Sequence, residues 1–241
     1  MRRGLKVIES GKKNAFYHMQ RDEALLKDLQ KNKEPCLHFY DWEKPTFTFG
    51  HFINIEQHLD LEAVKKENLD FAKRPTGGGI TFHLFDLSFS LLIPESHPHF
   101  SLNVLDNYAF INGIVLQAIK MFARVETEAV LLENQGNEIK AASYFCMAKP
   151  TKFDLVLNGK KLGGAAERVT KFGLLHQGTV AFKLPSDAFL ETVLKEKEVL
   201  SCMKKNSCLL LEEDADEKTV TKARNDIKQL LIDAFSLNLM Q

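Results

Sequence analysis

The feature of this sequence that most restricts its fold is a series of three short strand-like runs joined by tight turns. They cover residues 153–157, 161–168 and 173–182, and Asn158-Gly159 stands between the first two. Asn-Gly between two such runs is a strong signal for a two-residue hairpin. Strands joined by short turns pair antiparallel, because a parallel connection needs a dozen or more residues. The chain is therefore predicted to contain a hairpin-built sheet rather than a strict strand-helix alternation.

Helices are predicted around this sheet. Apolar residues recur with helical spacing in three longer stretches, 14–29, 101–122 and 217–235. The shorter runs are helices at 59–68 and 186–196 and strands at 5–9, 36–42, 46–49, 80–83 and 87–93. Together they predict an α+β fold with a mixed, mostly antiparallel sheet flanked by helices. The charge-rich segment 196–216 is the best linker candidate, so we expect one main domain over residues 1–200 and a short helical C-terminal extension over 201–241.

The composition argues against several classes of partner. The 241 residues carry 32 Lys and Arg against 32 Asp and Glu, so no global field holds a phosphate backbone and no nucleic acid is expected. No apolar stretch approaches the roughly 20 residues that span a bilayer, and the start of the chain lacks the apolar run of a signal peptide. We therefore expect no membrane partner and a cytoplasmic location. No metal site is predicted, since neither zinc nor redox spacing fits the four cysteines, Cys36, Cys146, Cys202 and Cys208.

A glycine-rich loop is the first candidate functional segment. Arg74 opens it, and Gly77, Gly78 and Gly79 close it before a predicted strand that ends at His83. Consecutive glycines lose much backbone entropy on folding, which makes sense where the backbone needs positive φ or lies against a ligand. Successive N–H groups, helped by an arginine, can hold a carboxylate or phosphate oxygen. The alternatives are a plain glycine turn and a core histidine.

The second candidate segment begins at Lys161. This lysine starts a predicted strand and is followed by the small residues Gly163, Gly164, Ala165 and Ala166. Small side chains along a strand leave room for a ligand to lie against it. A lysine beside that strip can neutralise a carboxylate, a phosphate or a developing oxyanion. The alternative is an ordinary hairpin with a solvated lysine.

Taken together, the two segments resemble one family. RPTGGGITFH, followed later by DLVLNGKKLGGAAER and LLHQGT, is similar to the lipoate–protein ligase A family, which shares its catalytic domain with biotin protein ligases and octanoyltransferases. The resemblance implies the biotin/lipoate protein ligase catalytic-domain fold, with a tunnel for an acyl chain. It also implies that a lipoyl or octanoyl group is attached to a lysine of a lipoyl domain. The acceptors implied are E2 subunits of 2-oxoacid dehydrogenases or the glycine cleavage H protein. The biotin-ligase motif GRGRxxR is missing, so biotin is not the expected substrate.

The resemblance also implies roles for individual residues. Lys161 would be catalytic, contacting the activated carbonyl. The residues implied to bind the acyl group or its adenylate are Arg74, Gly77, Gly78, Gly79, His83, Gly164, Ala165 and His176. Two positions depart from the family pattern: Leu84 stands where ligases have an aspartate after the loop histidine, and Gln177 stands within the HHG or QHG motif.

Cys146 bears on the choice between the two routes known in this family: a transferase that carries the acyl group on its own cysteine, and an ATP-dependent ligase. It lies 15 residues before Lys161, a placement that resembles the nucleophile of cysteine-type octanoyltransferases. A thiolate near a cationic lysine has a lowered pKa and is a good thioester nucleophile. The alternative is a small buried hydrophobe. Leu84 and the lack of the ligases' extra C-terminal domain favour the transferase, whereas the intact triple glycine is typical of ligases.

The sequence thus favours transfer from octanoyl–acyl carrier protein through a cysteine thioester, with Cys146 and Lys161 as catalytic residues. An ATP-dependent lipoate–protein ligase acting through lipoyl-AMP is the alternative. A non-catalytic binder of lipoyl domains or lipoate is the second alternative. No tightly bound cofactor is expected: lipoate or octanoate is the acyl substrate, and Mg-ATP is needed only by a ligase. An unrelated α+β domain would lack a tunnel between Gly78 and Lys161.

Overall fold

The computed structural model describes residues 4–123, 129–133 and 141–240. The strands are β1 (Lys6–Lys13), β2 (Cys36–Trp42), β3 (Thr46–Phe49), β4 (Asp70–Lys73), β5 (Ile80–His83), β6 (Asp86–Pro94), β7 (Ala129–Leu131), β8 (Leu155–Leu157), β9 (Lys160–Thr170) and β10 (Gly173–Ala181). The α-helices are α1 (Ala15–Asp28), α2 (Leu61–Lys66), α3 (Val104–Ala123), α4 (Asp187–Val193), α5 (Lys197–Asn206) and α6 (Glu217–Leu239). Two 3-10 turns are η1 (Ile55–Gln57) and η2 (Ala141–Tyr144).

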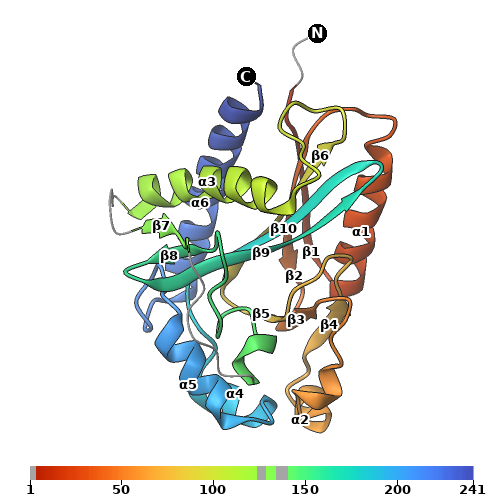
Figure 1. Ribbon diagram of the computed structural model, residues 1–241. Coiled ribbons are helices and arrows are strands. Elements are labelled where there is room, and N and C mark those ends of the chain that lie inside the picture. Colours follow the sequence, from red (N-terminus) through yellow and green to blue (C-terminus); the bar gives the residue numbers. More distant parts are fainter. Residues whose placement is uncertain (1–3, 124–128, 134–140, 241) are drawn as a thin grey trace.

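Seven strands form one large sheet in the order β1-β2-β6-β10-β9-β8-β7 (Figure 1). Its neighbouring strands are antiparallel except β1 and β2, which run parallel. The three strands predicted over residues 153–182 are β8, β9 and β10. Asn158 (φ 52°) and Gly159 (φ 73°) make the turn between β8 and β9, and positive φ at both residues is what a type I′ hairpin requires. The predicted α+β fold with a mostly antiparallel sheet is confirmed.

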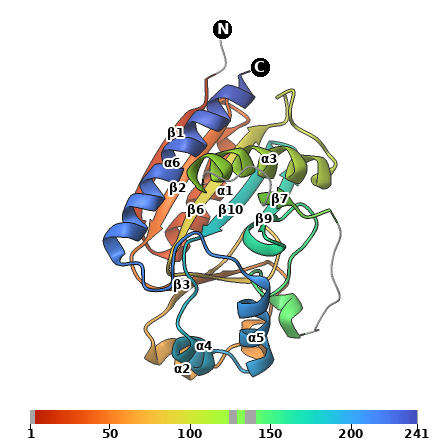
Figure 2. The same cartoon turned by 90° about the vertical axis from the view of Figure 1, so that its left-hand side faces the viewer.

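Helices cover both faces of the large sheet (Figure 2). α3 and α6 pack on one face and α1 on the other. Successive side chains of a strand point to opposite faces, so β2 sends Leu37 and Phe39 toward α3 and α6 and Cys36 toward α1. α6 contributes Ile227 and Phe235, both fully buried, to the first of these cores.

A smaller sheet with the strand order β4-β3-β5 lies below the large one in Figure 1. β3 pairs parallel with β4 and antiparallel with β5. The second hydrophobic cluster is built on this sheet with α2, α4 and α5, and includes Phe47, Ile80, Leu190 and Met203. Each sheet with its helices thus forms one half of the molecule. The loop 74–79, which connects β4 to β5, lies where the two halves meet.

The segment 196–216 was predicted to be a linker, and this prediction is wrong. It contains α5, whose Val199, Cys202 and Met203 are buried in the second cluster. These residues recur every three or four positions, and the lysines and glutamates between them lie on the exposed side of the helix. The predicted domain boundary at residue 200 falls inside α5, and α6 shares the core of the large sheet. The division into 1–200 and 201–241 stays a prediction.

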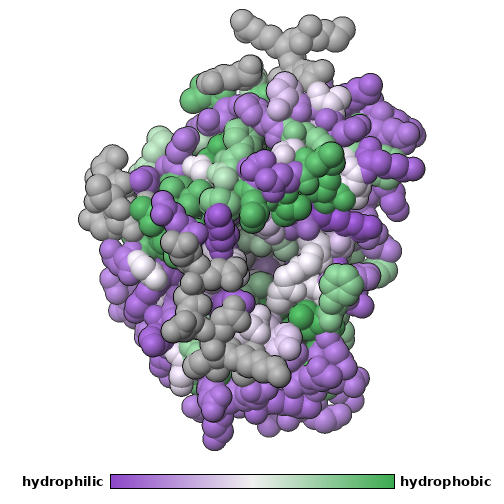
Figure 3. All heavy atoms as spheres, in the orientation of Figure 1, coloured by the Kyte–Doolittle hydropathy of each residue, from purple (hydrophilic) through white to green (hydrophobic). Residues whose placement is uncertain are grey.

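Within the described residues, no helix is long and apolar enough to cross a bilayer. On the face shown in Figure 3, apolar side chains gather across the upper part, over α3, while the lower part is mostly polar. The exposed apolar residues at and before α3 are Leu102, Val104, Leu105 and Met121.

Candidate functional site

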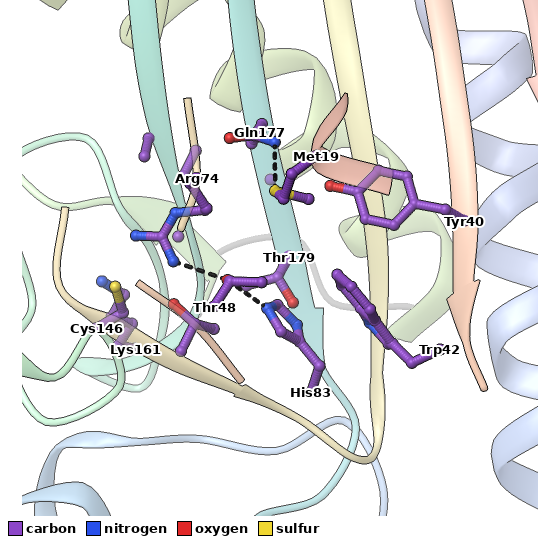
Figure 4. A pocket seen from close by; sticks show the side chains of 15 residues that line it. Met19, Tyr40, Trp42, Thr48, Arg74, His83, Cys146, Lys161, Gln177 and Thr179 are labelled. Atoms are coloured by element: carbon purple, nitrogen blue, oxygen red, sulfur yellow. Dashed lines mark hydrogen bonds between the residues drawn. The ribbon is translucent and has the colours of Figure 1, made fainter. Parts of the chain in front are cut away.

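A cavity lies where the α1 face of the large sheet meets the small sheet (Figure 4). Its walls come from α1, β2, β3, β5, β9 and β10, with the loop after β4 and the segment after η2. The lining residues are Met19, Tyr40, Trp42, Thr48, Arg74, Thr81, His83, Cys146, Lys161, Gly164, Ala165, Ala166, Gln177, Gly178 and Thr179. Six of them were predicted from the sequence to belong to the site: Arg74, His83, Cys146, Lys161, Gly164 and Ala165.

Arg74 holds the glycine loop in place. Its guanidinium, 6% exposed, donates to the carbonyl oxygens of Gly77 (2.9 Å) and Gly79 (2.7 Å) and to Oγ1 of Thr48 (2.8 Å). Gly78 has φ +84°, a conformation that side chains rarely adopt, and a Cβ on Gly79 would overlap the backbone of η2. The loop backbone therefore takes a shape that needs glycine at its last two positions. None of the three glycines lines the cavity. Gly77 and Gly79 are connected to it only through their hydrogen bonds with Arg74, which does line it.

Lys161 is buried beside a carboxylate. Its Nζ lies 2.6 Å from Oδ2 of Asp154 and 3.4 Å from the carbonyl oxygen of Lys149. The same Asp154 oxygen accepts from the backbone N–H and the hydroxyl of Thr151, at 2.6 and 2.7 Å. A Cβ on Gly164 would lie 2.8 Å from the lysine Nζ, so a glycine is needed for the side chain to lie along the strand. Asp154 balances the lysine charge and weakens the field that Lys161 exerts on a neighbouring thiol.

Cys146 is a half-exposed free thiol in the wall of the same cavity. Its backbone N–H donates to the carbonyl oxygen of Ile80 (2.9 Å), and a parallel bridge joins Ile80 to Phe145. These contacts fix the segment after η2 on the edge of β5. The thiol and the ammonium group predicted to act together therefore line one cavity, although they come from different parts of the fold.

His83 is the centre of a buried polar network. Its Nε2 lies 2.8 Å from Oγ1 of Thr48, and its Nδ1 lies 2.7 Å from Oδ2 of Asp86. The ring of Trp42 stacks on the imidazole with a centroid distance of 4.6 Å. The histidine is 6% exposed and is held on both nitrogens and on one face. His83 was predicted from the sequence to be a site residue, whereas its partners Thr48 and Asp86 were not.

Asp86 is an ionised partner for that histidine. Burial by itself raises the pKa of this carboxyl, but the charge of His83 and hydrogen bonds from His83, Thr179 and Ser88 lower it below the ordinary 3.8. Thr179 donates at 2.5 Å and Ser88 at 2.8 Å to the same oxygen. Asp86 stands three positions after His83, and a carboxylate within one short turn of a site histidine was the signal that could have identified it.

Gln177 closes the inner end of the cavity and was noted in the sequence only as a departure from a motif. Its Nε2 donates to Oδ2 of Asp22 (2.7 Å) and approaches Sδ of Met19 (3.4 Å), and its Oε1 accepts from Thr76 (2.7 Å). The amide thus ties the glycine loop to α1. The alternation of side chains along β10 could have identified Gln177, because it places this residue and His176 on opposite faces of the sheet.

His176 is not brought to the cavity. It points to the opposite face of β10, where its Nδ1 lies 2.8 Å from Oε1 of Glu167 and its ring stacks on Phe89. Both of these hydrogen-bonded side chains are fully buried. The predicted acyl or adenylate contact through this side chain therefore has no basis in its position, since the strand turns Gln177 and not His176 toward the site.

The chemistry available at this cavity is acyl transfer. A thiol can attack a thioester or an acyl adenylate, and a nearby lysine can stabilise the oxyanion that forms. Met19, Tyr40, Trp42 and Ala166 give the cavity apolar wall for an acyl chain. The cavity is lined by Arg74, at the start of the glycine loop, and by Lys161, whereas Gly78 does not line it.

Similar sequences among known proteins carry the name octanoyltransferase LipM. The octanoyltransferase LipM of Bacillus subtilis (strain 168) is 30% identical over 238 residues, which cover 93% of this chain and 84% of that protein. The octanoyltransferase LipM of Anoxybacillus flavithermus is also 30% identical, over 91% of this chain and 82% of its own length.

Solved structures share the fold. A lipoate-protein ligase A bound with ATP superposes with a TM-score of 0.75 at 24% identity, over 99% of this chain and 86% of that one. A bi-partite lipoate protein ligase from Thermoplasma acidophilum gives a TM-score of 0.72 at 20% identity, over 98% of this chain and 84% of that one. The biotin/lipoate ligase type of fold that the resemblance implied is confirmed.

The family model for the lipoyl protein ligase A/B catalytic domain matches residues 14–236, nearly the whole sequence. The match starts at the N-cap of α1 and reaches into α6, so it takes in every strand except β1 and every wall of the cavity. The chain therefore belongs to the lipoyl protein ligase A/B catalytic domain family.

Proposed function

We propose that this protein is an octanoyltransferase that carries an octanoyl group from acyl carrier protein to a lysine of a lipoyl domain, by way of a thioester on Cys146. The observation that carries the proposal is the placement of the Cys146 thiol and Lys161 in the wall of one cavity. Relatives at 30% identity over most of the chain bear the name octanoyltransferase, which supports the same reading.

The first half-reaction would load the enzyme. The Cys146 thiolate forms a bond to the thioester carbonyl carbon of the donor, the donor C–S bond breaks, and the electron pair leaves on the donor sulfur, which takes up a proton. Asp154 and the close approach to Gly164 hold Lys161 in the cavity wall, where its N–H groups would stabilise the oxyanion. The Arg74 guanidinium, which lines the cavity, would orient the acyl group.

The second half-reaction would pass the acyl group to the acceptor. The lysine of a lipoyl domain attacks the thioester on Cys146, giving an amide and the free thiol. The acceptors proposed are lipoyl domains of E2 subunits or the glycine cleavage H protein. One solved relative is described as a lipoate protein ligase with its E2 lipoyl domain, which supports this acceptor class. No tightly bound cofactor is needed by this route.

An ATP-dependent lipoate–protein ligase is the second candidate. It is favoured by the intact Gly77, Gly78 and Gly79 and by a solved relative of the same fold described as bound with ATP. In that route the acyl group arrives as an adenylate made from lipoate or octanoate and Mg-ATP, and Cys146 has only a packing role. Lys161 would then contact the α-phosphate as well as the carbonyl.

One experiment separates the two routes. The protein is incubated with octanoyl–acyl carrier protein and an apo lipoyl domain without ATP, and in parallel with lipoate, Mg-ATP and the same domain; intact mass spectrometry follows each species. The transferase predicts octanoylated domain in the first tube and a hydroxylamine-sensitive adduct on Cys146. Product only in the second tube would establish the ligase, and association without product in either tube would indicate a non-catalytic binder.

Matched variants sharpen this test. Cys146→Ser should abolish loading in the first tube, whereas Cys208→Ser, at a half-exposed free thiol outside the cavity, should not. Lys161→Ala should abolish transfer by either route, whereas Lys160→Ala, at the exposed neighbouring position, should not. Full activity of Lys161→Ala would refute the site assignment.

A further inference from the structure

The second half-reaction poses a problem of proton transfer. A lysine side chain has an ordinary pKa of about 10.4, so near pH 7.4 only about one in a thousand molecules carries the neutral, nucleophilic amine. A group in the cavity that accepts the surplus proton would remove this handicap. Such a group needs to be unprotonated at neutral pH and to have a lone pair that the cavity can reach, directly or through a relay.

Five titratable side chains line the cavity within the described part of the chain, namely Tyr40, Arg74, His83, Cys146 and Lys161. Arg74 is always protonated, and Lys161 is held as a cation 2.6 Å from the Asp154 carboxylate. Cys146 carries the acyl group at this stage. Burial raises the pKa of Tyr40 well above 10, so its phenol keeps its proton. Of these five, His83 remains.

The hydrogen bonds around His83 are compatible with a neutral ring whose Nε2 accepts a hydrogen bond. The Arg74 guanidinium donates to Oγ1 of Thr48 at 2.8 Å, so the Thr48 hydroxyl proton is free to point at Nε2 of His83, also 2.8 Å away. With Nε2 accepting, the ring proton sits on Nδ1 and is donated to Asp86 at 2.7 Å. The neutral tautomer satisfies every contact. A carboxylate at Nδ1 orients the ring and stabilises the imidazolium that would form.

The Thr48 hydroxyl lies between the histidine and the cavity. A threonine oxygen has two lone pairs, of which Arg74 uses one. The second is available to a donor in the cavity, since Thr48 is itself part of the lining. A proton that reaches this oxygen can be replaced by release of the original hydroxyl proton to Nε2.

We propose that His83 is the proton acceptor for the incoming lysine, with Thr48 as the relay and Asp86 as a positioning residue. The inference rests on the proposed transferase function and assigns a base to its second half-reaction. The buried hydrogen bonds from Thr48 to His83 and from His83 to Asp86 would thus serve catalysis, in addition to the packing of His83 on Trp42.

The lysine ammonium gives one proton to Oγ1 of Thr48 while Thr48 gives its own to Nε2 of His83. The neutral nitrogen then bonds to the thioester carbon, and the C–S bond breaks with its electron pair on the Cys146 sulfur. The surplus proton on the nitrogen passes to that sulfur. The products are the amide, the Cys146 thiol and an imidazolium, which returns its proton to water.

The test compares two acceptors with the octanoylated enzyme as the common starting point. Wild type, His83→Gln and the matched histidine variant His99→Gln are loaded from octanoyl–acyl carrier protein and mixed with an apo lipoyl domain or with hydroxylamine. Hydroxylamine is mostly uncharged at neutral pH, so its attack needs no proton acceptor. Loss of octanoyl mass from Cys146 is followed by rapid-quench intact mass spectrometry.

Relative to wild type, His83→Gln should transfer its acyl group to the lipoyl domain about 10²- to 10⁴-fold more slowly, with a much smaller change in loading and in release to hydroxylamine. Wild-type transfer to the lipoyl domain by His83→Gln would overturn the inference. An equal loss with both acceptors would also overturn it, because that result indicates an acyl-binding or structural role. If wild type itself fails to load without ATP, the proposed function falls first and takes this inference with it.

Two further substitutions guard against a folding defect at position 83. Thr48→Val removes the relay and should show the same split between the two acceptors, whereas Thr48→Ser keeps a hydroxyl and should lose much less. Asp86→Asn should slow transfer to the lipoyl domain more than release to hydroxylamine, which a purely structural role would not produce. Equal rates for Thr48→Val and Thr48→Ser would exclude the relay.

Discussion

Replacing Asp154 by asparagine removes the counter-charge of a buried lysine while it preserves the shape of the side chain. Lys161 and Asp154 are each 3% exposed, and their Nζ and Oδ2 atoms lie 2.6 Å apart. In the variant the ammonium group would stay in the cavity wall with an amide as its partner. Removing one member of a buried ion pair leaves an uncompensated charge, which is far more destabilising than removing both.

The magnitude follows from this burial. Breaking a buried pair from one side costs about 3–5 kcal/mol, and we expect the lower end, about 3 kcal/mol, because the amide oxygen still accepts hydrogen bonds. For a chain of this size 1 kcal/mol shifts Tm by about 2–4 °C, so the Asp154→Asn variant should melt about 6–12 °C lower.

The assay is calorimetric melting of the ligand-free protein, with two comparison variants. Asp226→Asn breaks the pair with Lys222, which has the same 2.6 Å separation but is 78% and 44% exposed, so its effect should be about 0.5 kcal/mol or less. The double variant Asp154→Asn/Lys161→Met removes both buried charges and should recover most of the loss. The reasoning is refuted if Asp154→Asn melts no lower than Asp226→Asn, or if the double variant melts below the single one.

Three other predictions concern the glycine loop, helix α6 and the stability of the protein at low pH. Gly79→Ala should destabilise the fold by about 1–3 kcal/mol in urea unfolding, because the new methyl overlaps backbone, whereas Gly77→Ala, with no atom within 4 Å, should stay within about 1 kcal/mol of wild type. Phe235→Ala should cost about 3–5 kcal/mol and Leu237→Ala, 63% exposed, about 0.5 or less; equal losses would argue against α6 as part of the core. Because the pKa of Asp86 is lowered on folding, its contribution is complete above about pH 4 and disappears as the pH falls through the depressed value, so Asp86→Asn should flatten the fall in unfolding free energy on acidification.

The features that could be predicted from the sequence are those set by neighbours along the chain. The turn at Asn158-Gly159 follows from two residues that tolerate positive φ, and it fixes the β8–β9 hairpin. The glycine triplet and the strand that begins near Lys161 were recognisable as motifs, and their resemblance to one family placed Cys146 in the same site. The α+β class followed from the spacing of apolar residues over whole elements.

The features that could not be predicted depend on which residues strand pairing and helix packing bring together. Thr48 and His83 are 35 positions apart in the sequence, and the pairing of β3 with β5 brings them together. No local sequence pattern indicates that these two side chains are in contact. The linker assignment failed at α5 because a short amphipathic helix rich in lysine and glutamate shows its apolar side only when a partner surface is present.

His176 and Gln177 show the same division at the scale of two residues. Alternation along a strand requires that they point to opposite faces, and this much the sequence determined by itself. Which face carries the cavity depends on where α1, α3 and α6 pack, so only the tertiary structure turned Gln177 toward the site and His176 toward the core. Short-range sterics and hydrogen bonding along the sequence determine local conformation. The partner of a buried polar side chain is decided by long-range packing, because that packing determines which groups lie within hydrogen-bond distance of it.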